Sequence, residues 1–444
     1  MNLINQRRIK DLRTFGVAPT IEYFYLISIF LVPASILLIR GSTSAILILL
    51  ALLSLFLGFI YINVKQYASD AIRFRYYSIA SLCFPLAIII QQVYLEQWDP
   101  RALDAISRLT IGFVLFFFLS ILNPQKLLHY FGWGCTAGAI GIFAWSIFFP
   151  PPAIWAGSHR LGNYYTNPIP FGDIAMLLGF LAVITMQSSE RSNLFIIFVR
   201  LFALVCGVYI SYKSGSRGGW VAMPFLVAII LAQNRSLLTR RLFYTLFTAI
   251  LVLLAVFFAS PYARHRLNDI FLNLSSFDAG NADTSVGLRL SLWQASVRLF
   301  LQNPLYGVGK GHLEPALHKL AQSGLLIPQA VNQHSHSDFF STIAEMGFIG
   351  LTCLLLLYFG LTYYFWINRK SSVDSTKTAA YSGLAVTSST IVFGATIDVL
   401  VPVMQVSLIA FSCAVFMAVI NSNIRKPNKL GSVIGHANSG DIIE

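Results

Sequence analysis

Long apolar segments alternate with short polar breaks along almost the whole chain. About 12 of these segments are candidate transmembrane helices, because the hydrocarbon core of a bilayer needs about 20 apolar residues per helix. They lie near residues 21–39, 44–64, 76–94, 105–122, 127–149, 169–187, 194–212, 219–232, 241–260, 337–367, 378–397 and 403–421. The pattern predicts an all-α polytopic membrane protein with about 12 transmembrane helices.

The tenth segment, residues 337–367, is too long for one simple crossing. We therefore expect its first part to extend beyond the outer face of the bilayer that the protein spans. The long polar stretch before it, residues 261–335, is also expected to contain helices. Leu288, Leu292, Ala295 and Leu299 recur at helical spacing, which predicts an amphipathic helix from about Ser285 to Gln302 with Arg289 on its flank. The Asn303-Pro304 pair ends that helix, and a second short helix is expected from about Leu313 to Ala321.

Composition supports a membrane protein. The chain is 56% hydrophobic and 11% charged, whereas soluble domains are typically about 25% charged. The basic start leads into an apolar run long enough to remain as an anchor, so no cleavable signal peptide is expected. All five cysteines fall inside apolar runs without a CxxC pair, which favours buried, inert thiols over a disulfide framework or a zinc site.

The net charge of +13 does not indicate nucleic-acid binding, because the basic residues are scattered between apolar segments and form no basic domain. They concentrate instead in alternate loops and at both ends of the chain, and the positive-inside rule then places both termini in the cytoplasm. The expected organisation is transmembrane helices 1 to 9 in residues 1–260, an external loop domain in 261–335, transmembrane helices 10 to 12 in 336–421, and a cytoplasmic tail in 422–444.

With this orientation, the sixth, eighth and tenth segments all begin at the outer surface, and each follows a distinctive polar stretch. These stretches are SHRLGNYYTNPIPFGD, KSGSRGGW and HSHSDFF, and they contain Arg160, Arg217 and His336. Helix N-termini favour anions, and guanidinium groups bind phosphate in a bidentate way. Each residue also has a simpler reading, since an arginine can anchor a helix at the interface and a histidine can cap one. The agreement of several motifs on one face favours a phosphate-type site.

The remaining candidates argue against a metal or a nucleotide. His312, His318, His334 and His336 match no standard zinc spacing, and the glycine-rich GVGKG stretch lacks the spacing of a P-loop. We therefore expect neither a metal nor another cofactor.

Four pieces of the chain resemble the O-antigen ligase and polymerase superfamily of bacterial inner-membrane glycosyltransferases, the Wzy/WaaL group. They are RLGNYYTNPIPFG, SGSRGGW, RLSLWQASVRLFLQNPLYGVGKG and HSHSDFFSTIAEMGFIG, and they occur in the expected order over about residues 159 to 351. One departure is Ser337, because many relatives have asparagine after the motif histidine.

The resemblance implies an O-antigen ligase, which moves a polysaccharide from undecaprenyl pyrophosphate to a hydroxyl of the lipid A–core oligosaccharide and inverts the anomeric centre. It implies a multi-pass protein of the bacterial inner membrane whose active site faces the periplasm. The partners are the lipid-linked glycan, the lipid A–core acceptor and membrane lipids. His336 is the expected catalytic base, which the helix N-terminus keeps neutral. The other expected site residues are Arg217, Arg289 and Arg160 on the donor pyrophosphate, with possible support from Lys213, His334 and Asp338.

Three other functions remain open. A Wzy-type polymerase uses the same donor with a growing lipid-linked glycan as acceptor, and a protein O-oligosaccharyltransferase transfers to a protein. A transporter is more distant, because transporters tend to place charged or helix-breaking residues at mid-membrane, whereas most polar motifs here lie at the outer edge.

Overall fold

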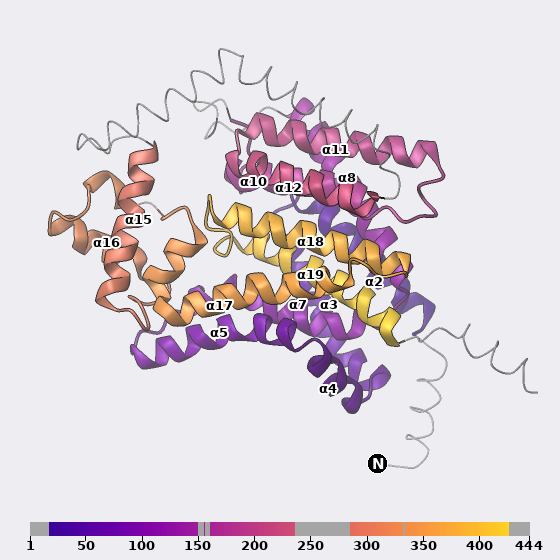
Figure 1. Cartoon of the computed structure of the whole chain (residues 1–444), viewed down its shortest axis with the longest axis horizontal. Coiled ribbons are helices and arrows are strands. Elements are labelled where there is room, and N and C mark those ends of the chain that lie inside the picture. The colour runs from indigo at the N-terminus through magenta and orange to yellow at the C-terminus, as the bar shows by residue number, and fades with distance from the viewer. Residues whose placement is uncertain (1–16, 150–154, 156–159, 236–284, 332–333, 426–444) are drawn as a thin grey trace, which may run out of the picture.

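The computed structural model describes residues 17–149, 155, 160–235, 285–331 and 334–425, and the regular elements in these ranges are all helices. The bundle is formed by α2 (Pro19–Ser35), α3 (Ser42–Tyr61), α4 (Val64–Arg73), α5 (Arg75–Tyr94), α6 (Arg101–Asp104), α7 (Ser107–Leu119), α8 (Pro124–Phe148), α10 (Pro168–Ile184), α11 (Leu194–Ser214), α12 (Arg217–Gln233), α17 (Asp338–Asn368), α18 (Asp374–Gly394) and α19 (Val403–Arg425). The helices α15 (Ser285–Gln302) and α16 (Leu313–Gln322) and the 3-10 turn η2 (Pro328–Ala330) lie at one end of it (Figure 1).

Each predicted apolar segment coincides with a helix, except for residues 241–260, which lie outside the described residues. Seven spans in the described ranges are long and apolar enough to cross a membrane: α3, α5, α6 with α7, α8, α11, α17 and α19. Three further apolar helices, α2, α10 and α12, are shorter. The protein is therefore a multi-pass, all-helical membrane protein, and the number of about 12 crossings stays a prediction.

Local sequence explains where several helices begin. The side chains of Asn123, Asn167 and Asn193 accept hydrogen bonds from backbone N–H groups at the starts of α8, α10 and α11. Proline occupies the first turn of α8 and α10, where its missing N–H group costs no helical hydrogen bond. These residues satisfy N–H groups that a helix leaves without an internal partner.

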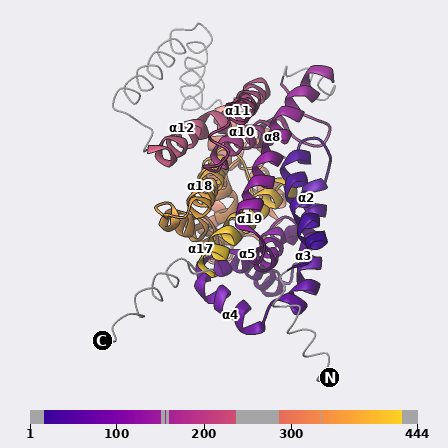
Figure 2. The same cartoon turned by 90° about the vertical axis from the view of Figure 1, so that its right-hand side faces the viewer.

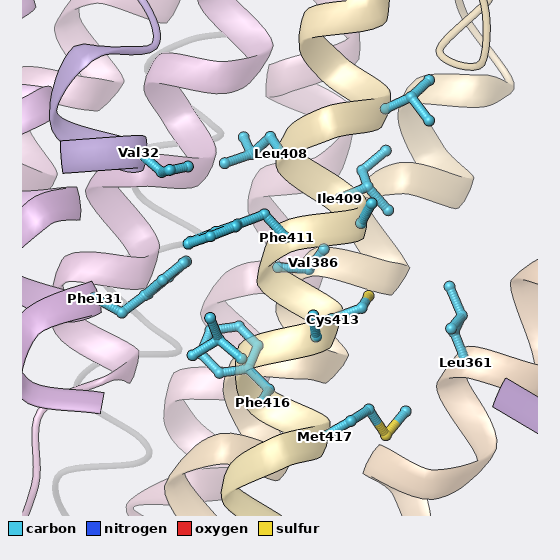
Figure 3. Packing of buried hydrophobic residues seen from close by; sticks show 14 of the residues in the cluster. Val32, Phe131, Leu361, Val386, Leu408, Ile409, Phe411, Cys413, Phe416 and Met417 are labelled. Atoms are coloured by element: carbon cyan, nitrogen blue, oxygen red, sulfur yellow. The ribbon is translucent and has the colours of Figure 1, made fainter. Parts of the chain in front are cut away.

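The helix α19 forms the centre of the bundle, as Figure 2 shows in the view along the helices. Its most apolar stretch is 89% buried, and α19 carries no charged side chain before Arg425. In Figure 3 its residues Phe411 and Phe416 face Phe131 of α8, with ring centroids 6.3 and 4.9 Å apart. A helix that is apolar on all sides is normally buried by its neighbours, and here α7, α8 and α18 cover it.

The loop helices form a small apolar core of their own against the start of α17. Leu292, Ala295 and Leu299 of α15 are buried there with Leu317 of α16 and Ala344 of α17. The predicted amphipathic helix at Ser285 to Gln302 and the second helix at Leu313 are both confirmed, the latter ending one residue later than expected. The described part of the loop, residues 285–331, thus has a defined packing against the start of α17.

The 31-residue helix α17 is divided at Gly347, whose φ of 59° and ψ of −146° are not helical. Residues before this break contact α15, and the tenth apolar segment continues beyond it. The backbone N–H groups of Phe348 and Ile349 donate to the carbonyl oxygens of Pro304 and Leu305, at 2.8 and 3.3 Å. The break therefore lets the chain that follows α15 pair with the backbone of α17 at the point where the helix is interrupted.

We expect Gly347→Ala to destabilise the protein by about 1–3 kcal/mol or more, since alanine is strained at this positive φ. Its Cβ would also lie 2.5 Å from the carbonyl oxygen of Pro304. Thermal unfolding in detergent measures the effect. The control is Gly141→Ala in α8, where the nearest atom to a new Cβ is the end of the Leu38 side chain at 3.2 Å. Equal stability of the two variants would show that the break at Gly347 is not required.

Candidate active site

The segment that precedes α10 is hydrogen-bonded to the turn between α11 and α12. The Arg160 guanidinium donates through Nε to the carbonyl oxygen of Ser214 at 2.8 Å and through an Nη to that of Gly215 at 3.3 Å. The backbone N–H of Leu161 donates to the carbonyl oxygen of Lys213 at 3.1 Å. Arg160 is therefore held beside the SGSRGG turn by main-chain oxygens.

The same turn places Arg217 at the first position of α12. Gly215 adopts the left-handed conformation with φ 64°, which ends α11, and the Ser216 hydroxyl caps α12 by accepting from the N–H of Gly219. That hydroxyl donates to the fully buried carboxylate of Asp173 in α10. The Arg217 side chain is exposed at this helix start.

Arg289 extends from α15 to the same place. Burial lowers the pKa of its guanidinium, and the positive charges of Arg217 and Arg160 lower it further. The guanidinium group of Arg289 is thus near enough to Arg217 and Arg160 to feel both charges. Arg160 is in turn bonded to the turn that carries Arg217, so three separate parts of the chain meet here. An arginine stays protonated in proteins, so the cluster favours a multiply charged anion.

His336 lies beside this guanidinium cluster of Arg160, Arg217 and Arg289. Its φ of 53° is unusual for a residue other than glycine. Its backbone N–H donates to Oδ2 of Asp398 at 3.2 Å, and the hydroxyl of Ser341 donates to Oδ1 of the same carboxylate. Asp398, in the connection between α18 and α19, therefore fixes the backbone of the histidine in a strained conformation.

Trp293 ties the loop helix α15 to the histidine segment. Its indole N–H donates to the carbonyl oxygen of Ser335 at 2.9 Å, and its ring stacks on Phe340 with centroids 4.8 Å apart. Trp293 lies one helical turn after Arg289, so the same helix orients both the guanidinium cluster and the start of α17.

The imidazole of His336 is biased toward its neutral form. Burial lowers its pKa, Arg289 and His334 lower it further, and only the negative charge of Asp398 acts in the opposite direction. A neutral histidine was expected from the helix N-terminus alone, whereas burial and the charge of Arg289 also lower this pKa. A neutral imidazole can accept a proton near pH 7.

The three residues expected to support the site lie in different environments. Lys213 is exposed at the end of α11. His334 is exposed and close enough to His336 to lower its pKa. Asp338 is buried, and its carboxylate accepts from the Tyr358 hydroxyl at 2.7 Å and from the backbone N–H of Leu400 at 3.1 Å. These contacts make Asp338 a link between α17 and the connection before α19.

Sequence reasoning assigned no role to Asp173, Asp398 or Lys310. Asp173 and Asp398 lie within or beside apolar segments, where a charged residue is costly and is normally functional or paired. Lys310 pairs with Glu345 in a buried contact, and the carboxylates of Glu345, Asp398 and Asp338 together raise its pKa against the effect of burial. The isolated charges in apolar surroundings could have marked these residues in the sequence. Their contact partners could not be found in this way, because they are distant in sequence.

The profile of the family described as O-antigen ligase matches residues 202–355. The resemblance to the O-antigen ligase family is confirmed over this segment. The chain is also 22% identical to an O-antigen ligase of Escherichia coli K12 over 252 residues, covering 56% of this chain and 57% of the relative. It is 27% identical to an uncharacterized protein of Haemophilus influenzae over 228 residues, covering 49% of this chain and 56% of the relative. The chain thus spans about half the length of the curated relatives it matches.

The O-antigen ligase family segment contains Arg217, Arg289 and His336 together with the whole of α15. Arg160, Asp173 and Asp398 lie outside it, although Arg160 belongs to the guanidinium cluster and Asp398 accepts from the His336 backbone N–H. Members of the family act on lipid-linked glycans in general. Among the described residues, no group of three or more His, Cys, Asp or Glu side chains is arranged to hold a metal ion.

Proposed function

We propose that this protein is an O-antigen ligase, which transfers a glycan from undecaprenyl pyrophosphate to a hydroxyl of the lipid A–core oligosaccharide. The supporting observation is that the guanidinium cluster lies close to His336, a half-buried histidine of lowered pKa, in a bundle of membrane helices. A lipid diphosphate carries the charge that this cluster favours, and its lipid tail matches the surrounding apolar helices.

The guanidinium cluster acts on the donor. Arg217 and Arg289 hold the pyrophosphate, and Arg160 adds positive charge from a position fixed by two main-chain oxygens. As the bond between the anomeric carbon and the phosphate oxygen breaks, its electron pair leaves with undecaprenyl pyrophosphate. Preorganised cations at this developing charge lower the barrier.

His336 acts on the acceptor. The acceptor hydroxyl oxygen attacks the anomeric carbon from the face opposite the pyrophosphate and forms the new glycosidic bond. Its proton passes to the neutral imidazole of His336. Inversion at the anomeric carbon follows from this single displacement, and no metal ion is needed to generate the nucleophile.

The orientation follows from the charge bias of the sequence. With both termini in the cytoplasm, the guanidinium cluster and His336 face the periplasm of a bacterial inner membrane. The donor must then arrive already activated, which a pyrophosphate-linked glycan satisfies.

A Wzy-type polymerase is the second candidate, and a protein O-oligosaccharyltransferase uses the same donor chemistry. The guanidinium cluster fits all three, because they differ in the acceptor. Arg289 belongs to α15, which lies at one end of the bundle (Figure 1). A transporter, in contrast, would need an ionic site deeper in the membrane.

The test is reconstitution of the purified protein in liposomes with undecaprenyl-pyrophosphate-linked glycan. Lipid A–core and a second lipid-linked glycan are offered in separate reactions. Transfer to lipid A–core supports the ligase, and extension of the lipid-linked glycan alone would instead identify a polymerase. Solute flux without glycan transfer would contradict both.

Asp398→Asn is expected to lower the transfer rate at pH 7 by about tenfold. It replaces the carboxylate by a neutral amide and so weakens the hydrogen bonds that hold the His336 backbone and Ser341. The Asp398 charge raises the pKa of His336, so its removal lowers that pKa further. The acid limb of the pH–rate profile should therefore move to lower pH. The matched control is Asp374→Asn at the opposite end of α18. A rate loss with an unchanged limb would show that Asp398 acts only on structure.

A further inference from the structure

A cavity of about 290 Å³ lies between α6, the turn that precedes α16 and the start of α17. Its charged walls comprise the carboxylates of Asp99, Glu314, Glu345 and Asp398 and the cations Arg101 and Lys310. None of the three arginines of the guanidinium cluster lines it. The cavity is thus a second polar site with a different electrostatic character.

The charge of the cavity argues against a phosphate ligand. Four carboxylates face it against two cations, and one of the cations, Lys310, is already paired with Glu345. Carboxylate oxygens accept hydrogen bonds from hydroxyl groups, whereas they repel an anion. Neutral ligands rich in hydroxyl groups fit this lining best.

The back wall of the cavity is rigid. Glu345 accepts from the ammonium group of Lys310 and, at 3.0 Å, from the backbone N–H of Gly311. Gln91 of α5 accepts from the N–H of Lys310 at 3.0 Å and donates to the carbonyl oxygen of Glu345 at 2.7 Å. These buried contacts hold the turn before α16 against α17, so the cavity has a preformed shape.

Asp398 and Ser341 connect the cavity to His336. Both residues line the cavity, and their mutual hydrogen bond lies next to the bond between Asp398 and the His336 N–H. His334, which also lines the cavity, is close enough to His336 to affect its pKa. His336 does not itself line the cavity, but a hydroxyl-bearing ligand there contacts Asp398, which holds the His336 backbone. The ligand then lies on a side lined by carboxylates and not by the guanidinium cluster.

We propose that this cavity binds an uncharged terminal sugar of the acceptor and presents its hydroxyl to His336. The volume lies near the lower end of the roughly 300–1,000 Å³ found for small-ligand sites, so it suits a short saccharide and not a polysaccharide. The division is electrostatic: the guanidinium cluster takes the donor diphosphate, and the acidic cavity takes the sugar. This inference rests on the proposed transferase function.

The test uses two variants on different walls, Ala102→Phe in α6 to fill the cavity and Glu314→Ala in α16 to remove a hydrogen-bond acceptor. Glu314→Ala should raise the KM for lipid A–core by about tenfold, as expected for loss of a hydrogen bond to a charged group. Ala102→Phe should raise the same KM by about tenfold or more, because the larger side chain takes the space of the sugar. The affinity for undecaprenyl pyrophosphate and the kcat at saturating acceptor should stay near wild type. Lys319→Ala, an exposed change on α16 outside the cavity, is the control.

Direct binding separates this proposal from the transferase function. The probe is core oligosaccharide released from lipid A by mild acid, titrated into the purified full-length protein. Binding that is weakened in both cavity variants supports the cavity even if no transfer occurs. Transfer by the wild type, with an unchanged acceptor KM and unchanged oligosaccharide binding in both variants, would overturn the cavity proposal alone.

Discussion

Replacing His336 by asparagine is expected to lower the rate of glycan transfer by about 10²- to 10⁴-fold, the usual loss for a general base. Asparagine is the informative substitution because His336 has a φ of 53°, a conformation that asparagine tolerates better than most residues. It should keep the backbone hydrogen bond to Asp398 but cannot accept the acceptor proton at neutral pH. The measurement is single-turnover transfer in liposomes.

The controls for His336 separate chemistry from folding. His318→Asn changes an exposed histidine on α16 and should leave the rate unchanged. The affinity of the His336 variant for undecaprenyl pyrophosphate should fall little, since the guanidinium cluster is intact. A near-normal rate in a properly inserted His336→Asn protein would exclude this residue as the base.

Arg289→Ala is expected to lower kcat/KM for the donor by about 10²- to 10³-fold, in line with the removal of one preorganised group that stabilises developing charge. Arg289 is half-buried, and its neighbours Arg217 and Arg160 both affect its pKa, so its charge lies within the guanidinium cluster. Lysine at the same position should restore part of the activity, because it keeps the charge without the bidentate geometry.

A second readout tests the position of Arg289. Its charge lowers the pKa of His336, so Arg289→Ala should raise that pKa and move the acid limb of the pH–rate profile to higher pH. This direction is opposite to the one expected for Asp398→Asn. Arg298→Ala, an exposed change on the same helix, should leave both kcat/KM and the limb unchanged. An unaltered affinity for the lipid diphosphate in Arg289→Ala would contradict its role in donor binding.

Much of the architecture followed from local sequence. Apolar segment length placed the bundle helices, and the spacing of Leu292, Ala295 and Leu299 located α15 within the long loop. Asparagine and proline also stand at the starts of α8 and α10, where they satisfy the first turn of each helix. These features could be predicted because the periodicity and the end signals of a helix lie in residues that are close in sequence.

The site was only partly predictable for the same reason. The contact of Asp398 with the His336 backbone joins residues 62 positions apart, and Lys310 and Glu345 are 35 apart. No spacing rule connects such pairs, since the packing of whole helices brings them together. The break at Gly347 was also not foreseen, although the excess length of the tenth segment suggested that it was not a single straight crossing.

The link between Trp293 and the histidine segment has a practical consequence for chimaeras between relatives. Arg289, Trp293 and the first turns of α17 form one packed unit, bounded at its far end by the break at Gly347. An exchange of residues 261–335 alone would separate Trp293 from its ring partner Phe340. An exchange of residues 285–346 would move both together, so a correctly folded chimaera is expected only with the longer replacement.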